Sequence, residues 1–217
     1  MAQTTERMSL IVFSGTVDKL MAASKCFLIH FIRTAAFAQQ IHNITGGYRM
    51  YRVGILTASD KGAAGEREDL SAGAIREIVS GLGWVVEVYR VVPDDPDKIS
   101  HALIDMADRE GLDLVLTTGG TGFSPRDNTP EATRSVIERE APGIPEVMRA
   151  VSLNKTPRAM LSRAVAGIRK STLIINLPGS QKAVRECLEA IIEALPHGLE
   201  ILTGRGGECG SPPLQKS

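Results

Sequence analysis

The stretch "TTGGTGFSPRD" at residues 117–127 combines three glycines, several hydroxyl side chains and one carboxylate, Asp127, directly after an apolar run. Glycines leave backbone N–H groups open to a ligand, so this run with its threonines is suited to phosphate oxygens or the edge of a nucleotide's sugar. Two common nucleotide loops are excluded: no G-x-x-x-x-G-K-[ST] occurs in the chain, and Pro125 stands where a dinucleotide fingerprint needs its third glycine. The loop predicts an anion site, with a plain tight turn as the alternative.

Three other polar stretches stand at comparable points of the chain, each between an apolar run and a predicted helix. They are "TASDKG" at 57–62, "VPDDPD" at 92–97 and "LPGSQK" at 177–182. Ligands of open α/β sheets bind beyond the carboxyl ends of the strands, where such loops lead into helix N-termini. If the preceding strands are all parallel, the four loops meet at one edge of the sheet, and this convergence is the main indication of a functional site. "LPGSQK" also offers Lys182 at a helix start, which favours an anion, although an ordinary capped helix explains it as well.

Two carboxylates in these loops are candidates for metal binding. Asp94 and Asp127 each follow a predicted strand and precede a predicted helix, so they could face one another across the site. Two carboxylates in such a place commonly hold Mg²⁺ that bridges phosphate oxygens. Helix capping is the alternative for either residue, and spacing does not separate Asp94 from its neighbour Asp95.

The stretch "AMLSRAVAGIRKS" at 159–171 carries a serine and three cations. Arg163, Arg169 and Lys170 could clamp a phosphate, with a solvated surface as the alternative. No histidine accompanies Ser162 in a hydrolase pattern and G-x-S-x-G is absent, which argues against a nucleophilic serine. The chain also lacks H-E-x-x-H, so the sequence does not favour a zinc site.

The elements that must position these residues alternate between strand and helix from residue 52 onward. Near-continuous apolar runs predict strands at 52–58, 84–92, 113–118 and 172–177. Apolar residues at helical spacing predict helices at 69–82, 97–109, 129–137, 145–153 and 181–195. The expected N-caps are Asp69, Thr129 and Ser180, and the expected end of the final helix is Pro196. This alternation predicts an α/β protein, a three-layer α/β/α sandwich with a mostly parallel central sheet, preceded by a short N-terminal extension.

Composition and charge place the chain among ordinary globular proteins. Of its 217 residues, 43% are hydrophobic and 23% charged, and the formal net charge is +0, which gives no support to a nucleic-acid or membrane-surface role. The apolar stretch "KCFLIHFIRTAAFA" is interrupted by His30 and Arg33, so we expect no membrane span. Three cysteines without C-x-x-C spacing suit a reducing compartment, and we expect a cytoplasmic protein.

The character of the sequence changes near residue 50. Before it, "SLIVFS" is typical of a strand, "TVDKLMAASKCFLIHFIRTAAFA" of an amphipathic helix and "HNITGGYRM" of a turn-rich linker. We therefore expect an N-terminal extension of unclear role at 1–50 and one domain at 51–204. Glycine and proline are frequent after Gly204, so a flexible C-terminal tail is expected at 205–217.

Taken in order, "VGILTASD", "VPDD", "TTGGTGFSPRDNTPEA" and "RAMLSRAVAGIRKSTLIINLPGSQKAVRE" resemble the molybdopterin adenylyltransferases of the MogA type. The G domains of plant and animal molybdenum-cofactor proteins, including gephyrin, share this pattern. The resemblance covers residues 52 to about 204, roughly three quarters of the chain. It implies a homotrimer of α/β/α sandwiches that uses Mg²⁺ and ATP to adenylylate the terminal phosphate of molybdopterin, with release of pyrophosphate. Hand-over of the product to a molybdenum insertase is a further expectation.

The resemblance also implies roles for individual residues. Asp94 and Asp127 fall on the aspartates that the family requires for the reaction, as catalytic residues and metal ligands, and Ser162 falls on a serine that handles the substrates, molybdopterin included. Residues of the glycine and "LPG" loops would bind ATP: Gly119, Gly120, Thr121, Gly122, Pro178 and Gly179. Ser59 and Asp60 would lie near molybdopterin.

Three other interpretations stay open. A family member could bind molybdopterin without adenylyltransferase activity, a scaffold role like that of gephyrin could stand beside the enzyme, or the chain could be an unrelated nucleotide-binding enzyme. Retention of both aspartates and of the full "LSR" stretch favours the enzyme.

Overall fold

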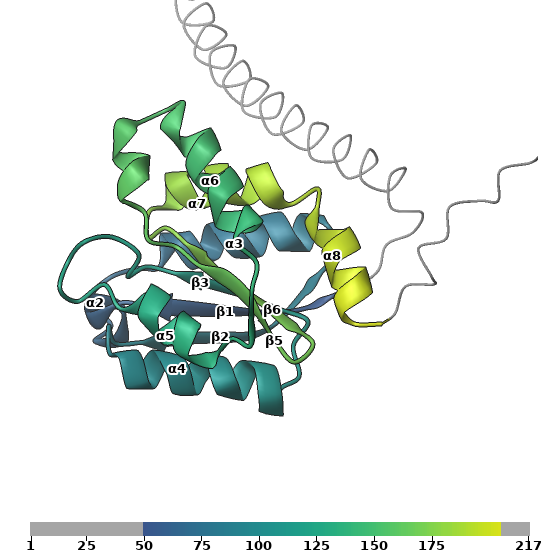
Figure 1. Ribbon diagram of the computed structural model, residues 1–217. Coiled ribbons are helices and arrows are strands. Elements are labelled where there is room, and N and C mark those ends of the chain that lie inside the picture. Colours follow the sequence, from purple (N-terminus) through teal and green to yellow (C-terminus); the bar gives the residue numbers. More distant parts are fainter. Residues whose placement is uncertain (1–49, 205–217) are drawn as a thin grey trace, which may run out of the picture. The chain divides into compact units, whose positions relative to one another are not determined.

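The computed structural model describes residues 50–204, whose centre is a six-stranded sheet with the strand order β2-β1-β3-β6-β5-β4 (Figure 1). Strands β1, β2, β3 and β6 are parallel, and β5 runs antiparallel to both β6 and β4. Their bounds are β1 Arg52–Ala58, β2 Val85–Val92, β3 Leu114–Thr118, β4 Arg139–Glu140, β5 Ala166–Arg169 and β6 Thr172–Leu177. The four strands predicted from apolar runs are therefore the four parallel ones.

Helices cover both faces of the sheet, with α4 and α5 on one side and α3, α6 and α7 on the other (Figure 1). This arrangement confirms the predicted three-layer α/β/α sandwich. The helices are α2 Asp60–Ala63, α3 Leu70–Gly81, α4 Pro96–Ile104, α5 Thr129–Val136, α6 Gly143–Leu153, α7 Gln181–Ile191 and α8 Leu195–Leu202. A π-helical turn at Asp105–Arg109 extends α4, and a 3-10 turn at Pro157–Leu161 follows α6.

The three central strands are buried along almost their whole length, as expected for parallel strands with helices on both faces. On the side of α4 and α5, Leu56, Val115 and Ile174 from adjacent strands pack with Ile99 and Met106 in one apolar cluster. Strand β2 lies at the edge and alternates between exposed and half-buried residues. The central strands thus form a rigid platform that ends at the loops containing the candidate site.

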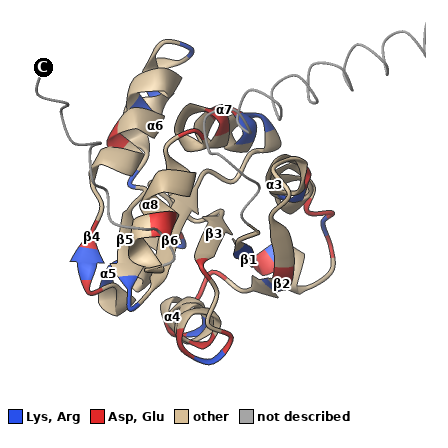
Figure 2. Ribbon diagram, turned by 90° about the vertical axis from the view of Figure 1, so that its right-hand side faces the viewer, with Lys and Arg blue, Asp and Glu red and all other residues tan. Residues whose placement is uncertain are grey.

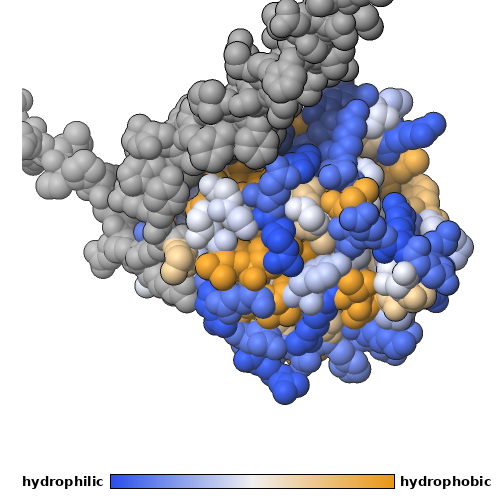
Figure 3. Space-filling view, turned by 180° about the vertical axis from the view of Figure 1, so that it is seen from behind, coloured by the Kyte–Doolittle hydropathy of each residue, from blue (hydrophilic) through white to orange (hydrophobic). Residues whose placement is uncertain are grey.

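Charged residues of both signs lie on the helices, the loops and outer strands such as β2 and β4, whereas β3 and β6 carry none (Figure 2). On the face shown in Figure 3, hydrophobic residues form small areas separated by hydrophilic ones. Scattered exposure of this kind is normal for a folded domain. Within residues 50–204, no helix combines the length and the apolar character that crossing a membrane requires.

The structure confirms two predicted caps: Asp69 accepts a hydrogen bond from the N–H of Ala72, and Ser180 accepts one from the N–H of Ala183. The third prediction is wrong, because Thr129 is the first helical residue of α5 and not its N-cap. Its hydroxyl oxygen is buried and has no hydrogen-bond partner among the described residues.

The end of the last predicted helix also differs. Helix α7 ends at Ile191, and Pro196 does not terminate it but lies in the first turn of α8, where proline loses no hydrogen bond. Strands β4 and β5 were not predicted, since two- and four-residue strands carry too short a pattern. The strand, helix and linker predicted before residue 50 and the tail predicted after residue 204 lie outside the described residues.

Candidate functional site

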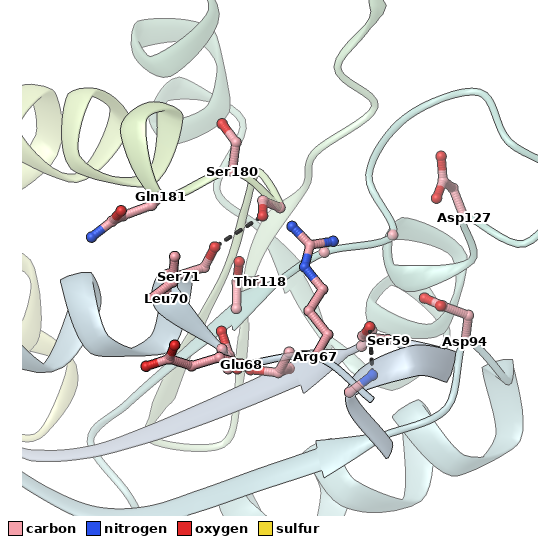
Figure 4. A pocket seen from close by; sticks show the side chains of 17 residues that line it. Ser59, Arg67, Glu68, Leu70, Ser71, Asp94, Thr118, Asp127, Ser180 and Gln181 are labelled. Carbon is pink, nitrogen blue, oxygen red and sulfur yellow. Dashed lines mark hydrogen bonds between the residues drawn. The ribbon is translucent and has the colours of Figure 1, made fainter. Parts of the chain in front are cut away.

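The carboxyl ends of β1, β2, β3 and β6 bring their loops together around a cavity of about 340 Å³. Each of the four loops contributes to its wall, and residues 67–71 at the start of α3 close another side. Six of the predicted site residues line this first cavity: Ser59, Asp94, Gly119, Gly120, Asp127 and Gly179. Figure 4 shows the side chains of both aspartates at the same side of it. The predicted convergence of loops is thus present.

The glycine loop lies so close to its neighbours that side chains do not fit. Gly119 has φ of 94°, and a Cβ atom there would lie 2.3 Å from the carbonyl oxygen of Ala58 at the end of β1. Gly120 has φ of 61°, and its Cβ would lie 2.4 Å from the Thr129 hydroxyl and 3.3 Å from Oδ1 of Asp94. Both glycines therefore serve a left-handed turn and a close backbone approach.

Asp94 is oriented by reciprocal hydrogen bonds with Asp60. The N–H of Asp60 donates to Oδ2 of Asp94 at 2.9 Å, and the N–H of Asp94 donates to Oδ1 of Asp60 at 3.0 Å. Arg126 holds Asp60 in turn through a two-pronged ion pair, which keeps the pKa of the Asp60 carboxyl below its usual value. Asp95 instead accepts hydrogen bonds from Asp97 and Lys98 and caps α4. The structure therefore separates the two neighbouring aspartates that spacing left equivalent.

Asp127 belongs to the glycine loop and does not cap α5. Its Oδ2 accepts a hydrogen bond from the N–H of Ser124 at 2.9 Å. Behind the loop, the guanidinium of Arg163 donates to the carbonyl oxygens of Gly122 and Asp127 and pairs with Glu131. Arg163, predicted as a phosphate clamp, thus holds the loop from behind.

Asp94 and Asp127 line the same cavity, and neither carboxylate forms an ion pair with a residue in the range 50–204. Burial raises the pKa of the Asp94 carboxyl, and the charges of Asp60 and Asp127 raise it further, against the Asp60 backbone hydrogen bond and the charge of Arg126. Oδ1 of Asp94 and Oδ1 of Asp127 accept no hydrogen bond from residues 50–204. Two carboxylate oxygens of this kind suit a hard divalent cation, whose charge would relieve the repulsion.

No group of three or more acidic, histidine or cysteine side chains suited to a metal occurs within residues 50–204. A Mg²⁺ ion at Asp94 and Asp127 would therefore take its remaining ligands from water and from a substrate. This is the usual way in which proteins bind Mg²⁺, because the ion keeps much of its hydration shell. The donor set present fits a magnesium ion delivered with a nucleotide.

A second cavity of about 270 Å³ is lined by four of the five remaining predicted residues, Thr121, Gly122, Ser162 and Pro178, and the fifth, Asp60, lines neither cavity. Its walls are more apolar and include Met148, Leu161 and Cys187. Ser162 thus lies apart from the aspartate pair. Because residues 119–120 and 179 line the first cavity while residues 121–122 and 178 line the second, the same two loops border both.

Three predicted placements differ from the structure. Asp60 does not line the first cavity, because its carboxylate is engaged with Asp94 and Arg126. Arg169 and Lys170 both bind Asp108, so neither reaches either cavity as a phosphate clamp.

Sequence reasoning missed the wall formed by residues 67–71. Ser71 donates from its hydroxyl to the carbonyl oxygen of Gly179 at 2.9 Å, which ties the start of α3 to the "LPG" loop. The Thr118 hydroxyl donates to the carbonyl oxygen of Pro178 at 2.8 Å and joins the glycine loop to the same place. The sequence did offer one indication of this wall, the predicted helix cap Asp69. Residues just before a helix N-terminus lie at the carboxyl ends of the strands in this kind of sheet, where ligands bind.

Comparison with known proteins agrees with this geometry. Residues 54–197 match the family model described as "Probable molybdopterin binding domain". A molybdopterin adenylyltransferase of Helicobacter pylori J99 is 48% identical over 165 residues, which cover 75% of this chain and 94% of that protein. The molybdopterin adenylyltransferase of Escherichia coli K12 is 43% identical over 145 residues, 66% of this chain and 74% of that protein.

Solved structures show the same fold. The molybdopterin biosynthesis enzyme MoaB from Thermus thermophilus superposes with a TM-score of 0.69 at 59% identity, over 71% of this chain and 98% of that one. Both the extent of the family match and the identity to these relatives exceed what shared fold alone would give. The chain belongs to the MoCF_biosynth family of molybdopterin-binding domains.

Proposed function

We propose that this protein is a molybdopterin adenylyltransferase of molybdenum-cofactor biosynthesis. In this reaction the terminal phosphate of molybdopterin receives AMP from ATP, and pyrophosphate leaves. The observation that carries the proposal is the placement of Asp94 and Asp127 together with the glycine loop in the wall of one cavity. The family and its adenylyltransferase members support it.

The site offers the groups that adenylyl transfer needs, and the direct transfer requires no protein nucleophile. A phosphate oxygen of molybdopterin attacks the α-phosphorus of ATP, forming the new O–P bond while the bond from the α-phosphorus to the bridging oxygen breaks. Gly119, Gly120 and the start of α7 line the cavity, and their backbone N–H groups would stabilise the anionic oxygens. The rate enhancement comes from positioning and charge stabilisation.

Two carboxylates of the site fit a magnesium ion. Asp94 and Asp127 would hold it through the oxygens that accept no hydrogen bond from the described residues. When bound, the ion would supply positive charge that stabilises the reacting phosphates. The reciprocal bonds between Asp60 and Asp94 keep the carboxylate in place while the substrates exchange.

The two cavities suggest that different parts of the substrates bind in each of them. The apolar walls of the second cavity, with Met148 and Leu161, suit the base of the nucleotide, and Ser162 stands there to meet its polar edge. The first cavity, polar and lined by both aspartates, suits the phosphates and molybdopterin. The loops at residues 119–122 and 178–179 then lie beside the α-phosphate.

We further propose that the protein works in the cytoplasm as a homotrimer that passes its product to a molybdenum insertase, as the family pattern implies. Exposed apolar side chains on and after α6 support a subunit contact: Val147 and Leu153 are each 44% exposed and Met160 64%. Exposed apolar side chains on neighbouring elements offer area that a partner subunit can bury.

The test is pyrophosphate release from ATP on addition of molybdopterin. We expect release with the wild-type protein and a loss of at least about 100-fold in Asp127→Ala, since a charge-stabilising group is removed from the transition state. Asp97→Ala is the matched control, because Asp97 is an exposed acid on α4 that does not line the cavity.

Binding of molybdopterin without pyrophosphate release would refute the enzyme and favour the alternative, a family member that only binds the pterin. Full activity in Asp127→Ala would remove Asp127 from the mechanism. Both proteins must show wild-type circular dichroism spectra, so that unfolding is not mistaken for lost chemistry.

A further inference from the structure

Arg67 lines the first cavity among acids. Glu68, Asp69, Asp94 and Asp127 belong to the same wall, and within the described part of the chain Arg67 is the one lysine or arginine that lines it. Figure 4 shows its side chain extending into the middle of the pocket. Four carboxylates repel a substrate that carries several phosphates, so the placement of a single cation in their midst matters to binding.

The other arginines near this edge of the sheet are engaged with protein groups. Arg126 is held by the Asp60 carboxylate, and Arg163 by Glu131 and two carbonyl oxygens. In contrast, Arg67 makes no hydrogen bond or ion pair with any residue in the range 50–204. Its five N–H donors therefore remain available to a ligand.

The backbone that carries Arg67 is anchored on its C-terminal side. Two residues later, Asp69 accepts hydrogen bonds from the hydroxyls of Thr57 and Tyr89, which tie it to β1 and β2. Ser71 then binds the carbonyl oxygen of Gly179. The root of the Arg67 side chain is thus fixed relative to both phosphate-facing loops, and less freedom is lost when the guanidinium meets a ligand.

We propose that Arg67 binds phosphoryl oxygens of the substrate in the first cavity. The planar guanidinium matches two oxygens of a phosphate at once, which a lysine does not. The identity of the substrate rests on the proposed function: the phosphate belongs either to the triphosphate of ATP or to molybdopterin. The chemistry recognised is the same for both, and steady-state kinetics separates them.

The experiment compares wild type with Arg67→Ala and Arg67→Lys in pyrophosphate release, with ATP and molybdopterin varied in turn. We expect Arg67→Ala to raise the KM for one substrate about 10- to 100-fold, the range for a lost charge-assisted hydrogen bond, and Arg67→Lys to lie in between. Arg109→Ala is the control, since its side chain is 79% exposed and, among residues 50–204, pairs only with Asp105 on its own helical turn.

A raised KM for ATP assigns Arg67 to the triphosphate, and a raised KM for molybdopterin assigns it to the pterin phosphate. Unchanged kinetic constants in Arg67→Ala overturn the inference while leaving the proposed function intact. Calorimetric binding of inorganic tripolyphosphate provides a readout that does not need catalysis. If wild type releases no pyrophosphate, the proposed function fails, and the affinity for tripolyphosphate alone decides whether Arg67 binds phosphoryl oxygens. An affinity about 10-fold lower in Arg67→Ala but not in Arg109→Ala supports the inference. Equal or undetectable binding in wild type and Arg67→Ala overturns it.

Discussion

Gly119→Ala tests the close approach on which the site geometry depends. A Cβ at this position would lie 2.3 Å from the carbonyl oxygen of Ala58, where ordinary contacts begin at 3.4 Å. The loop and the end of β1 must then separate by about 1 Å, and the close-packed centre of the sheet leaves little room for that. The residue also has φ of 94°, a conformation that L-residues adopt with strain.

The expected cost has two parts. The left-handed backbone costs about 1–2 kcal/mol and the overpacking about 1–3 kcal/mol, so we expect a total of about 2–5 kcal/mol. Gly111→Ala is the matched control, because Gly111 also has positive φ, 61°, but its Cβ would meet nothing nearer than Arg52 Nη1 at 3.8 Å. Only the backbone cost of about 1–2 kcal/mol applies there.

Equilibrium unfolding in urea measures both variants. With a slope of about 2 kcal/mol per molar urea, Gly119→Ala should lower the midpoint by about 1–2.5 M, and Gly111→Ala by about 0.5–1 M. Pyrophosphate release at low denaturant should fall about 100-fold in Gly119→Ala, since a displacement of about 1 Å misplaces the reacting groups, and should be unchanged in Gly111→Ala. Equal stabilities together with a wild-type rate in Gly119→Ala would refute the close-approach reasoning.

Three other predictions concern the same site and its support. Asp95→Ala removes a helix cap, so it should lower the free energy of unfolding in urea by about 1 kcal/mol and keep pyrophosphate release within a few-fold of wild type. Asp94→Ala should lower the rate of pyrophosphate release at least about 100-fold. The reverse pattern would exchange the roles assigned to the two aspartates. Asn176→Leu should lower the free energy of unfolding in urea by about 2–3 kcal/mol, because the buried N–H of Val165 loses its acceptor, Oδ1 of Asn176. An unchanged unfolding midpoint would argue against a stabilising role for this hydrogen bond. Chelation of Mg²⁺ by EDTA should stop pyrophosphate release without shifting the thermal unfolding midpoint. The reason is that residues 50–204 contain no group of three or more side chains that could hold a structural metal. A large downward shift of the midpoint would contradict this prediction.

Much of the fold follows from local sequence, because the parallel strands are uniformly apolar and the helices carry regular stripes. Leu114 to Thr118, for example, is buried at every position and is typical of a core strand. The meeting of the loops also follows, since parallel strands place their carboxyl ends at one edge. The sequence therefore predicts the location of the site better than it predicts the function of any one side chain.

The rest depends on partners far away in the chain. Asp94 and Asp95 have the same local context, and only contacts with Asp60 on one side and with the first turn of α4 on the other separate them. The arginines differ in the same way: Arg163 was a plausible phosphate clamp by spacing, yet loop carbonyls occupy it, while Arg67 stood in an unremarked loop and faces the cavity. No local sequence pattern shows which arginine side chain is already bound to another group of the protein.

The pair of Asp94 and Asp127 shows why contacts with residues outside the cavity lining matter. Asp60 and Arg126 lie beside the cavity and not in its lining, but Asp60 bonds Asp94, and Arg126 immediately precedes Asp127 in the chain. The ion pair between them therefore links the β1 loop to the glycine loop and fixes the two cavity acids relative to each other. As an exposed ion pair it contributes little to stability. Its larger effect is geometric, because it holds the backbone beside both carboxylates, and one oxygen of each accepts no hydrogen bond from residues 50–204.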